Sequence, residues 1–218
     1  MTNKIAHHLT DSLLMAYSSG NLSEAFSLAV ATHVSLCDEC RARLGAFDSV
    51  GGALLEQSEL PEMSQGSMAA ALAAAKGKPV EPRAARSAPR RAGVLPPPLQ
   101  DYVGGDLEAV KWRSVGMGVR QAILPIKGEA TARLLHIRAG AAVPDHGHKG
   151  MELTLVLQGA FMDADDRFAR GDIEIATEDL EHTPIADIGE DCICLAVTDA
   201  PLKFNSWVAR AAQPFLRI

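Results

Sequence analysis

The chain has 218 residues, of which 47% are hydrophobic and 22% charged, and its 21 Lys and Arg against 27 Asp and Glu leave a net charge of −6. This length and composition fit one large globular domain or two small ones and exclude a disordered tail. The apolar runs are too short to cross a bilayer and residues 1–8 do not resemble a secretory signal, so we expect a cytoplasmic protein with no membrane partner. The acidic balance argues against direct nucleic-acid binding, which needs a dense basic surface.

The chain before residue 78 shows the spacing of apolar side chains that is typical of short helices. Thr10 or Asp11 can cap a first helix, and Gly20-Asn21 can end it. Ser23 can begin a second helix. One face of this second helix carries residues at spacings of four, three and four, namely Phe26, Val30, His33 and Cys37.

Two more helices are expected before residue 78. One follows Asp38 and turns Leu44, Phe47 and Leu54 inward, and an Ala-rich one runs from about 61 to 76. Four short helices make a thin core, and a core of this size usually needs a disulfide or a metal ion to stabilise it.

A metal motif, H-x3-C-x2-C, begins at His33. His33 and Cys37 lie one helical turn apart, and Cys40 lies within reach of Cys37 across the start of the next helix. Imidazole and thiolate are the ligands that tetrahedral zinc prefers. A closed site needs a fourth ligand, for which His7 and His8 are the candidates. The alternative is a buried histidine and two buried cysteines that bind no metal.

Proline and arginine concentrate in the middle of the chain. Six of the twelve prolines lie between Pro79 and Pro98, which predicts an extended linker. Basic residues begin just before it and continue through it, and they are Lys76, Lys78, Arg83, Arg86, Arg90 and Arg91. We interpret this run as a solvated tether; the alternative is a contact with nucleic acid, as in a DNA-binding repressor.

The chain after residue 100 has a different pattern. Short runs rich in Leu, Ile, Val and Thr predict strands over 134–139, 151–157 and 192–198, separated by Gly, Asp and Pro turns. This pattern predicts a small all-β barrel. The whole chain is therefore expected to be an α + β protein of two domains, whose boundaries we place at 1–78 for a small four-helix, zinc-stapled domain, 79–100 for the Pro/Arg-rich linker and 101–218 for the barrel.

The second half carries its own metal motif, G-x5-H-x-H-x3-E-x6-G, which begins at Gly140. His146 and His148 face the same side of an extended strand, and Glu152 follows at an even offset. His182 can supply a further ligand. Three imidazoles and a carboxylate suit zinc, iron, manganese or nickel. Surface histidines without a metal are the alternative.

Two cysteines alternate along the last predicted strand. Cys192 and Cys194 face the same side of it, and they can be a redox pair or extra metal ligands. The other interpretation is that they are small core residues. An unstrained disulfide does not easily join cysteines at i and i+2 of one strand.

Both motifs resemble those of a known family. The segments HLTD at 8–11 and ATHVSLCDECR at 31–41 resemble the zinc-binding anti-sigma domain of the ChrR family, over roughly residues 7–76. In that family the fourth ligand is a histidine just before the first helix, which here selects His8 over His7. The second half resembles the cupin fold, with the first cupin motif complete; the second is degenerate and keeps His182.

The order of the two domains matches the ChrR architecture. The resemblance implies an anti-sigma factor, not an enzyme, that binds an extracytoplasmic-function (group IV) sigma factor and keeps it from RNA polymerase. It implies one zinc ion in each domain, and release of the sigma factor when the cupin domain senses an oxidative signal such as singlet oxygen. The residues expected to contact the sigma factor are Leu13, Leu14, Met63, Met68 and Leu72.

The rival interpretation is a metal-dependent cupin enzyme, such as a dioxygenase or an isomerase, with the helices as a dimerisation module. A metal held by the cupin ligands could leave coordination positions open for a substrate or for O2. A redox-active metal would favour that enzyme, whereas zinc would favour the regulator.

Overall fold

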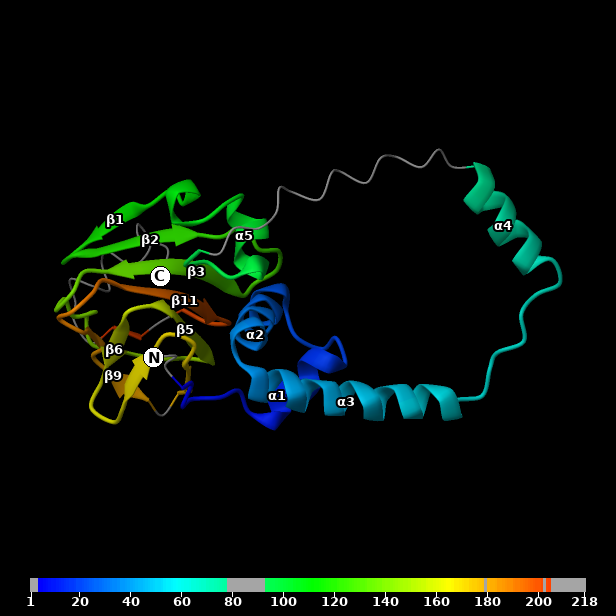
Figure 1. Cartoon of the computed structure of the whole chain (residues 1–218), viewed down its shortest axis with the longest axis horizontal. Helices are drawn as coiled ribbons and strands as arrows, with labels where there is room; N and C mark the ends of the chain where they lie inside the picture. Colours follow the sequence, from blue (N-terminus) through cyan, green and yellow to red (C-terminus); the bar gives the residue numbers. More distant parts are fainter. Residues whose placement is uncertain (1–3, 78–92, 179, 202, 205–218) are drawn as a thin grey trace.

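A computed structural model describes residues 4–77, 93–178, 180–201 and 203–204, and it has a helical N-terminal region followed by a β-rich part (Figure 1). The helices of the described residues are α1 (Asp11–Ser18), α2 (Glu24–Leu36), α3 (Asp38–Gln57), α4 (Ser67–Gly77), α5 (Pro97–Val103) and the short 3-10 helix η1 (Leu107–Ala109). None of these helices is long and apolar enough to span a membrane.

The strands form antiparallel sheets that together have a cupin-like arrangement. They are β1 (Arg113–Gly116), β2 (Val119–Ile123), β3 (Thr131–Ile137), β4 (His146–Gly147), β5 (Glu152–Gln158), β6 (Ala160–Met162), β7 (Arg167–Ala169), β8 (Ile173–Ala176), β9 (Glu181–His182), β10 (Ile185–Ala186), β11 (Cys192–Thr198) and β12 (Lys203–Phe204). In the described residues, one sheet has the order β1-β2-β3-β11-β5-β8, and two smaller ones have the orders β10-β6-β7 and β12-β4-β9.

The three strands that the sequence predicts are the centre of the large sheet. They correspond to β3, β11 and β5, and β11 is buried along its whole length. Strands that are covered on both faces read as continuous apolar runs, which is why their pattern was recognisable. An all-β barrel is not confirmed, because the sheets of the described residues are not closed into one hydrogen-bonded barrel and because α5 belongs to this part.

The first three helices begin where the sequence predicts. The hydroxyl of Thr10 accepts a hydrogen bond from the backbone N–H of Leu13 at the start of α1, and Ser23 precedes α2. A single residue, Cys37, separates α2 from α3. α3 continues without interruption through Gly51 and Gly52 and ends at Gln57.

A packed four-helix domain is not confirmed either. α1 and α2 pack against α3, whereas α4 stands apart from the other helices and from the sheets (Figure 1). Leu54 was expected to turn inward but is 63% exposed, because α3 extends beyond the helices that could cover it.

Helix α2 contacts β3, β5 and β11, so it covers the large sheet, and it also packs against α5. The apolar residues of α2 and of the sheet therefore form one continuous cluster. Leu95 and Leu99, which fall within the predicted linker, are buried in the same cluster. The rest of that linker, from 79 to 92, lies outside the described residues, and so do the basic residues Lys78, Arg83, Arg86, Arg90 and Arg91.

Candidate metal centres

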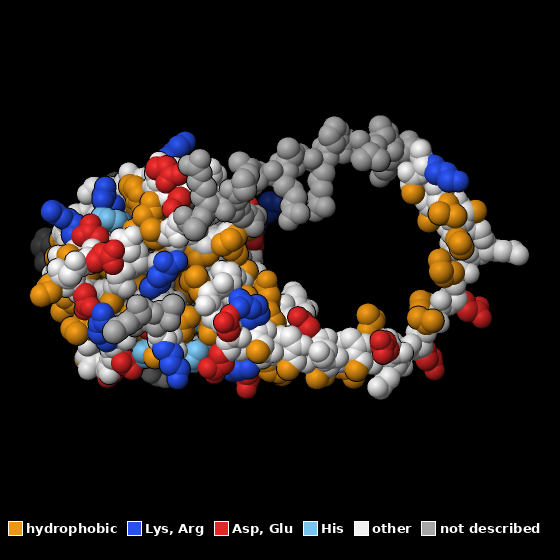
Figure 2. All heavy atoms as spheres, viewed as in Figure 1, with side chains coloured by type: hydrophobic (Ala, Val, Ile, Leu, Met, Phe, Trp, Pro, Cys, Tyr) orange, Lys and Arg blue, Asp and Glu red, His pale blue; other side chains and the backbone are white. Residues whose placement is uncertain are grey.

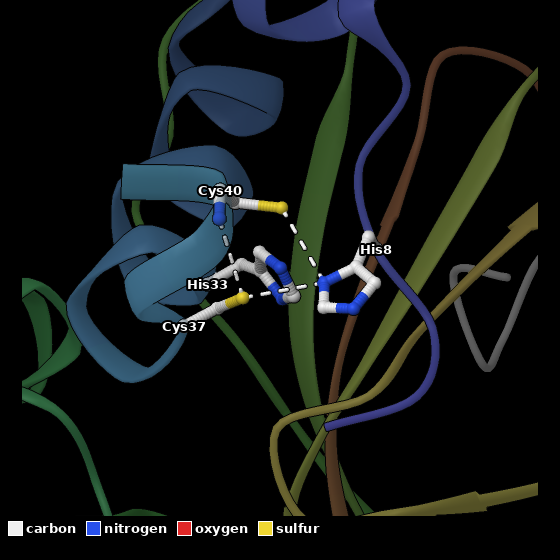
Figure 3. A group of neighbouring side chains, drawn as sticks. All are labelled: His8, His33, Cys37 and Cys40. Atoms are coloured by element: carbon white, nitrogen blue, oxygen red, sulfur yellow. Dashed lines mark hydrogen bonds between the residues drawn. The ribbon is translucent and has the colours of Figure 1, made fainter. Parts of the chain in front are cut away.

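Four predicted ligands come together where the helices meet the sheet. His33 lies in the last turn of α2, Cys37 joins α2 to α3, and Cys40 lies in the first turn of α3. His8 reaches them from the segment before α1 (Figure 3). One ligand atom from each residue lies within 4.8 Å of all the others. We call these four residues the His/Cys centre.

The contacts within the His/Cys centre are those of ligands that face a common point. The Sγ atoms of Cys37 and Cys40 lie 3.3 and 3.7 Å from His8 Nδ1. Neither ring nitrogen of His33 forms a hydrogen bond of good geometry within the described residues, although this side chain is fully buried. Burial lowers the pKa of His33 to about 4, so the imidazole is neutral and its lone pair is free.

The donor set fits a metal ion. Burial raises the pKa of the Cys40 thiol to about 11, and a bound cation is the kind of partner that stabilises a buried thiolate. A buried imidazole without a partner costs free energy that a metal bond would recover. Two imidazoles and two sulfur atoms are a usual ligand set of tetrahedral zinc.

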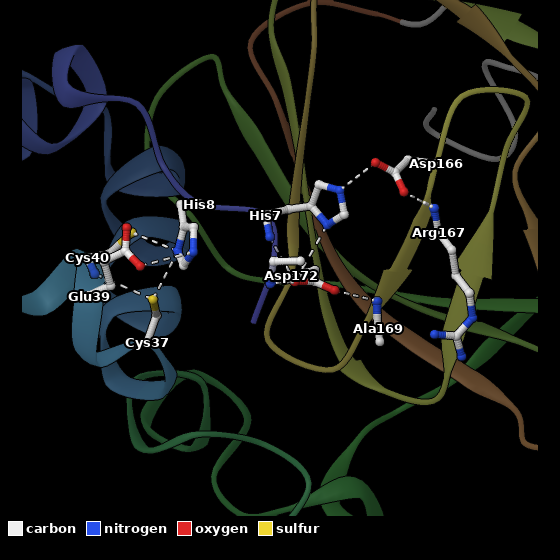
Figure 4. A network of polar contacts seen from close by, with 10 residues as sticks. His7, His8, Cys37, Glu39, Cys40, Asp166, Arg167, Ala169 and Asp172 are labelled. Carbon is white, nitrogen blue, oxygen red and sulfur yellow. Dashed lines mark hydrogen bonds and ion pairs between the residues drawn. The ribbon is translucent and has the colours of Figure 1, made fainter. Parts of the chain in front are cut away.

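His7 does not join its neighbour His8. Its ring points the opposite way, toward the β-rich part, and its Nε2 lies 2.9 Å from Asp166 Oδ2 (Figure 4). The structure therefore brings His8, the residue selected by the family resemblance, to the metal ligands.

Three histidines form a second group in the β-rich part. His146 on β4 is the direct partner of His182 on β9, and His148 follows β4. Their ring centroids lie 4.8 to 5.4 Å apart. All three side chains are buried. We call them the cupin triad.

The protonation states of two members of the cupin triad also suit a metal. Burial lowers the pKa of His146 and of His148 to about 4, so both rings are neutral. The Nδ1 of His146 lies 2.8 Å from the carbonyl oxygen of Pro144, a contact that orients the ring. Among the described residues, neither His148 nitrogen forms a hydrogen bond, and the same is true of His182 Nε2.

Glu152 lies beside the cupin triad rather than within it. Its Oε2 is 3.6 Å from His148 Nδ1, and its Oε1 accepts a hydrogen bond from the Thr154 hydroxyl. Burial raises the pKa of this carboxyl group. The three histidines, without Glu152, are the ligands that converge on one point in the structure.

Sequence reasoning missed two acidic residues behind His182. Its Nδ1 lies 3.0 Å from Glu174 Oε1 and 3.3 Å from Asp163 Oδ2. Both carboxylate side chains are buried, and these contacts raise the pKa of His182 against the opposing effect of burial. A carboxylate that binds the far nitrogen of a ligating histidine orients the ring. For Glu174 the sequence does give a signal, because this charged residue stands between two isoleucines in β8.

Cys192 and Cys194 lie on β11, in an apolar cluster with Val156 and Phe161. Their sulfur atoms are 3.4 Å apart. The contact with Cys192, together with burial, raises the pKa of Cys194 well above its usual value, so it is a thiol and a weak nucleophile. Neither residue is part of a metal-ligand group found in the described residues. This environment favours the core interpretation, and the redox role stays a prediction.

The five residues expected to contact a partner fall into two classes. Leu13 and Leu14 are only 6% and 0% exposed, because α1 turns them into the apolar cluster, so they do not form an outer surface in this structure. By contrast Met63, Met68 and Leu72 are at least half exposed. Further exposed apolar side chains on α3 and after it are Val50, Leu54, Leu55 and Leu60 (Figure 2).

Comparison with known proteins extends over nearly the whole chain. Residues 100–201 match the ChrR cupin-like domain family. The chain is 62% identical to the anti-sigma-E factor ChrR of Cereibacter sphaeroides, over 98% of this chain and 99% of that protein. The crystal structure of Rhodobacter sphaeroides SigE in complex with the anti-sigma ChrR matches with 60% identity and a TM-score of 0.77, over 90% of this chain and 100% of that chain. The structure of KdgF from Halomonas sp. is only distantly similar: it is 20% identical, with a TM-score of 0.39 over 43% of this chain and 90% of that chain.

Proposed function

The chain belongs to the ChrR family of anti-sigma factors, and from that premise we propose that it binds an extracytoplasmic-function (group IV) sigma factor and keeps it from RNA polymerase. It is a regulatory protein and not an enzyme. The observation that carries the proposal is the 62% identity, over 98% of the chain, to an anti-sigma-E factor. The similar ChrR chain of known structure was crystallised with SigE.

The partner surface we propose consists of the exposed apolar side chains from the second half of α3 to α4. We call it the outer helix surface, and it comprises Val50, Leu54, Leu55, Leu60, Met63, Met68 and Leu72. Each of these side chains is 51% or more exposed. An apolar surface of this extent on a soluble chain usually binds a partner, and amphipathic helices commonly bind in an apolar groove.

The outer helix surface differs from the set of sigma-factor contacts that the sequence predicts. Leu13 and Leu14 are excluded from it by their burial, whereas Met63, Met68 and Leu72 remain. Methionine side chains are flexible and polarisable, so they adapt well to a partner's surface.

The His/Cys centre is proposed to bind one zinc ion that fixes the packing of α2, α3 and the segment before α1. Zinc binding supplies folding free energy that a small core lacks. We keep the division between a helical anti-sigma part over 1–78 and a cupin part. We place the start of the cupin part near Val94 rather than at residue 101, because Val94, Leu95 and Leu99 belong to the same apolar cluster as the large sheet.

The cupin triad, with Glu152 beside it, is proposed to bind a second zinc ion. In this view the cupin part senses an oxidative signal, for which singlet oxygen is our candidate, and the sigma factor is then released. The support is the donor set: three buried histidines whose ligand atoms lie within 4.8 Å of one another, and carboxylates next to them. Cytoplasmic location is proposed with the function, because the partner acts on RNA polymerase.

The experiment that tests the proposed function is a binding titration with Rhodobacter sphaeroides SigE as the probe. Wild type should bind it. Introducing two charges with Met68→Glu and Leu72→Glu should weaken binding at least about tenfold, since central interface residues commonly contribute more than 1 kcal/mol each.

The matched control is the pair Ala70→Glu and Ala74→Glu, which adds the same two charges to the opposite side of α4 and should change the dissociation constant less than about twofold. No binding by wild type would contradict the function. Equal binding by wild type and the Met68→Glu and Leu72→Glu double variant would show that the outer helix surface is not the binding site, but it would leave the proposed anti-sigma function intact.

A further inference from the structure

Residues 5–8 run from the surface of the β-rich part to the His/Cys centre, and we call them the N-terminal strap. The strap lies along the β-rich part and ends at His8, one of the four members of the His/Cys centre (Figure 4). His7 and His8 point in opposite directions. One side of the strap is therefore bound to the cupin part, while its last residue faces the helices.

The Asp172 carboxylate accepts two of the hydrogen bonds between the strap and the cupin part, and another runs from the backbone N–H of Ile173 to the carbonyl oxygen of His7 at 3.4 Å. The backbone N–H groups of Ala6 and His7 both donate to Asp172 Oδ1, at 2.7 and 3.0 Å. The other oxygen, Oδ2, accepts from the backbone N–H of Ala169 at 2.8 Å. Asp172 is 4% exposed, so these bonds are shielded from water. One oxygen thus binds the strap and the other binds the cupin part itself.

The rest of the turn between β7 and β8 fits closely against the strap. A Cβ atom on Gly171, whose φ is +93°, would come within 2.6 Å of Ile5 Cδ1. The His7 ring lies 4.3 Å from the ring of Phe168, centroid to centroid. The ion pair of His7 with Asp166 is a smaller contribution, because the Asp166 side chain is 60% exposed.

The elements that contact the strap are the same ones that contact the back of His182. β8 begins directly after Asp172 and carries Glu174, which lies 3.0 Å from His182 Nδ1. The turn between β6 and β7 carries Asp163, which lies 3.3 Å from the same nitrogen. Asp163 Oδ1 also accepts from the backbone N–H of Asp166, the residue that binds His7.

We propose that Asp172, and secondarily Asp166, are positioning residues that bind the N-terminal strap to the cupin part, so that the state of the cupin triad sets how tightly His8 is held in the His/Cys centre. The two centres are then coupled through short, packed elements, and the Pro-rich segment between them is not needed for the coupling. For its biological meaning, this inference rests on the proposed function, since it names the route by which a change in the sensor part reaches the sigma-binding part.

Cobalt substitution in the full-length chain separates the two centres. Thiolate ligands give Co²⁺ an intense charge-transfer band, and only the His/Cys centre offers cysteines. The measurement is the rate at which this band disappears after addition of excess EDTA. Asp172→Ala should speed the loss about tenfold or more, as is typical when a group that orients a metal ligand is removed.

A matched control is available in Asp106→Ala. Asp106 also accepts from two backbone N–H groups, those of Val94 and Leu95, but it lies away from the strap. Its rate of cobalt loss should stay within about twofold of wild type. A rate for Asp172→Ala that equals the rate for Asp106→Ala would overturn the proposal.

The conservative variant Asp172→Asn covers the case in which Asp172→Ala does not fold. An amide has one acceptor oxygen, so it can bind either the strap or Ala169 but not both. The rate of cobalt loss from Asp172→Asn should lie between the rates of wild type and Asp172→Ala. Amide hydrogen exchange at Ala6 and His7 should also be faster in Asp172→Asn than in wild type. Unchanged exchange at these two residues would contradict the proposal.

A double-mutant cycle tests the coupling itself. His146→Ala disturbs the cupin triad without removing any group that contacts the strap, and it should change the rate of cobalt loss from the His/Cys centre. In the Asp172→Asn background the same substitution should have a clearly smaller effect. Equal effects in both backgrounds would show that the coupling does not run through Asp172. Because no arm uses a sigma factor, the result is independent of whether the proposed function holds.

Discussion

The His/Cys centre and the cupin triad are both built from buried histidines, but they differ in how they are enclosed. Four ligands from three chain segments surround the first, including two cysteines. In the second, three histidines converge, and carboxylates lie around and behind them. A closed set of four ligands is typical of a structural metal, whereas three ligands leave a position that a small molecule can reach.

The comparison assigns different tasks to the two centres. The His/Cys centre lies where α2, α3 and the strap meet, so a metal there determines the shape of the helical part. The cupin triad lies on and just after the short strands β4 and β9 of a three-stranded sheet, and a metal there would affect mainly the side chains around it.

The largest expected effect is that of Cys37→Ser. It removes a ligand of the closed centre, so the metal content should fall by one ion per chain and the free energy of unfolding should fall by several kcal/mol. Elemental analysis and urea unfolding measure the two quantities. Cys192→Ala is the control, because it removes one buried sulfur atom at a cost of about 1 kcal/mol and should leave the metal content unchanged. If both variants kept full metal content, the His/Cys assignment would be wrong.

Acid should destabilise the metal-depleted chain through its neutral histidines. The pKa of His148 is about 4 in the folded chain against an ordinary value of 6.5. The unfolded chain therefore binds a proton that the folded chain does not, and stability is lost as the pH falls from 6.5 toward 4. The slope is about 1.4 kcal/mol per pH unit for one histidine.

The variant His148→Gln isolates this contribution. In urea unfolding with EDTA, the free energy of unfolding of this variant should change less steeply with pH than that of wild type, by that amount. His7 and His182 have raised pKa values and contribute a slope of opposite sign, which is present in both proteins. Identical pH dependence in the two proteins would contradict the buried, neutral state of His148.

A smaller effect is expected when the support of His182 is weakened. Glu174→Gln removes the charge behind Nδ1 and should lower the metal affinity of the cupin triad by about 10- to 100-fold. Competition with a chromophoric chelator measures the affinity. Glu181→Gln, on the exposed neighbour of His182 in β9, is the control and should leave it unchanged. An equal loss in both variants would exclude a specific role for Glu174.

The smallest effect concerns the start of α1, just after the strap. Thr10→Ala removes the hydroxyl that accepts from Leu13 and should lower the free energy of unfolding by about 1 kcal/mol. Ser49→Ala, which removes an exposed hydroxyl from the interior of α3, is the matched control. An unchanged free energy of unfolding in Thr10→Ala would show that this hydroxyl does not cap α1.

The parts predicted from the sequence are those with local patterns. The ligands from His33 to Cys40 lie within one helix and the start of the next, so spacing alone placed three of them together. The central strands β3, β5 and β11 were recognisable from their continuous apolar runs. The histidines of the cupin motif were found by their alternation.

The parts that could not be predicted depend on contacts between distant segments. Asp172 binds residues that precede it by 165 and 166 positions, and no periodic pattern marks such a pair. Leu13 and Leu14 have the same helical spacing whether they face a partner or the chain's own core. That question was decided by α2 and the sheet, which share a single apolar cluster with α1.

The most direct test of the account is SigE binding by three full-length proteins: wild type, Cys37→Ser and His146→Ala. If the His/Cys centre shapes the sigma-binding part and the cupin triad serves the sensor, Cys37→Ser should lose binding while His146→Ala keeps a dissociation constant within about threefold of wild type. Loss of binding in His146→Ala together with full binding in Cys37→Ser would contradict this division between the two centres.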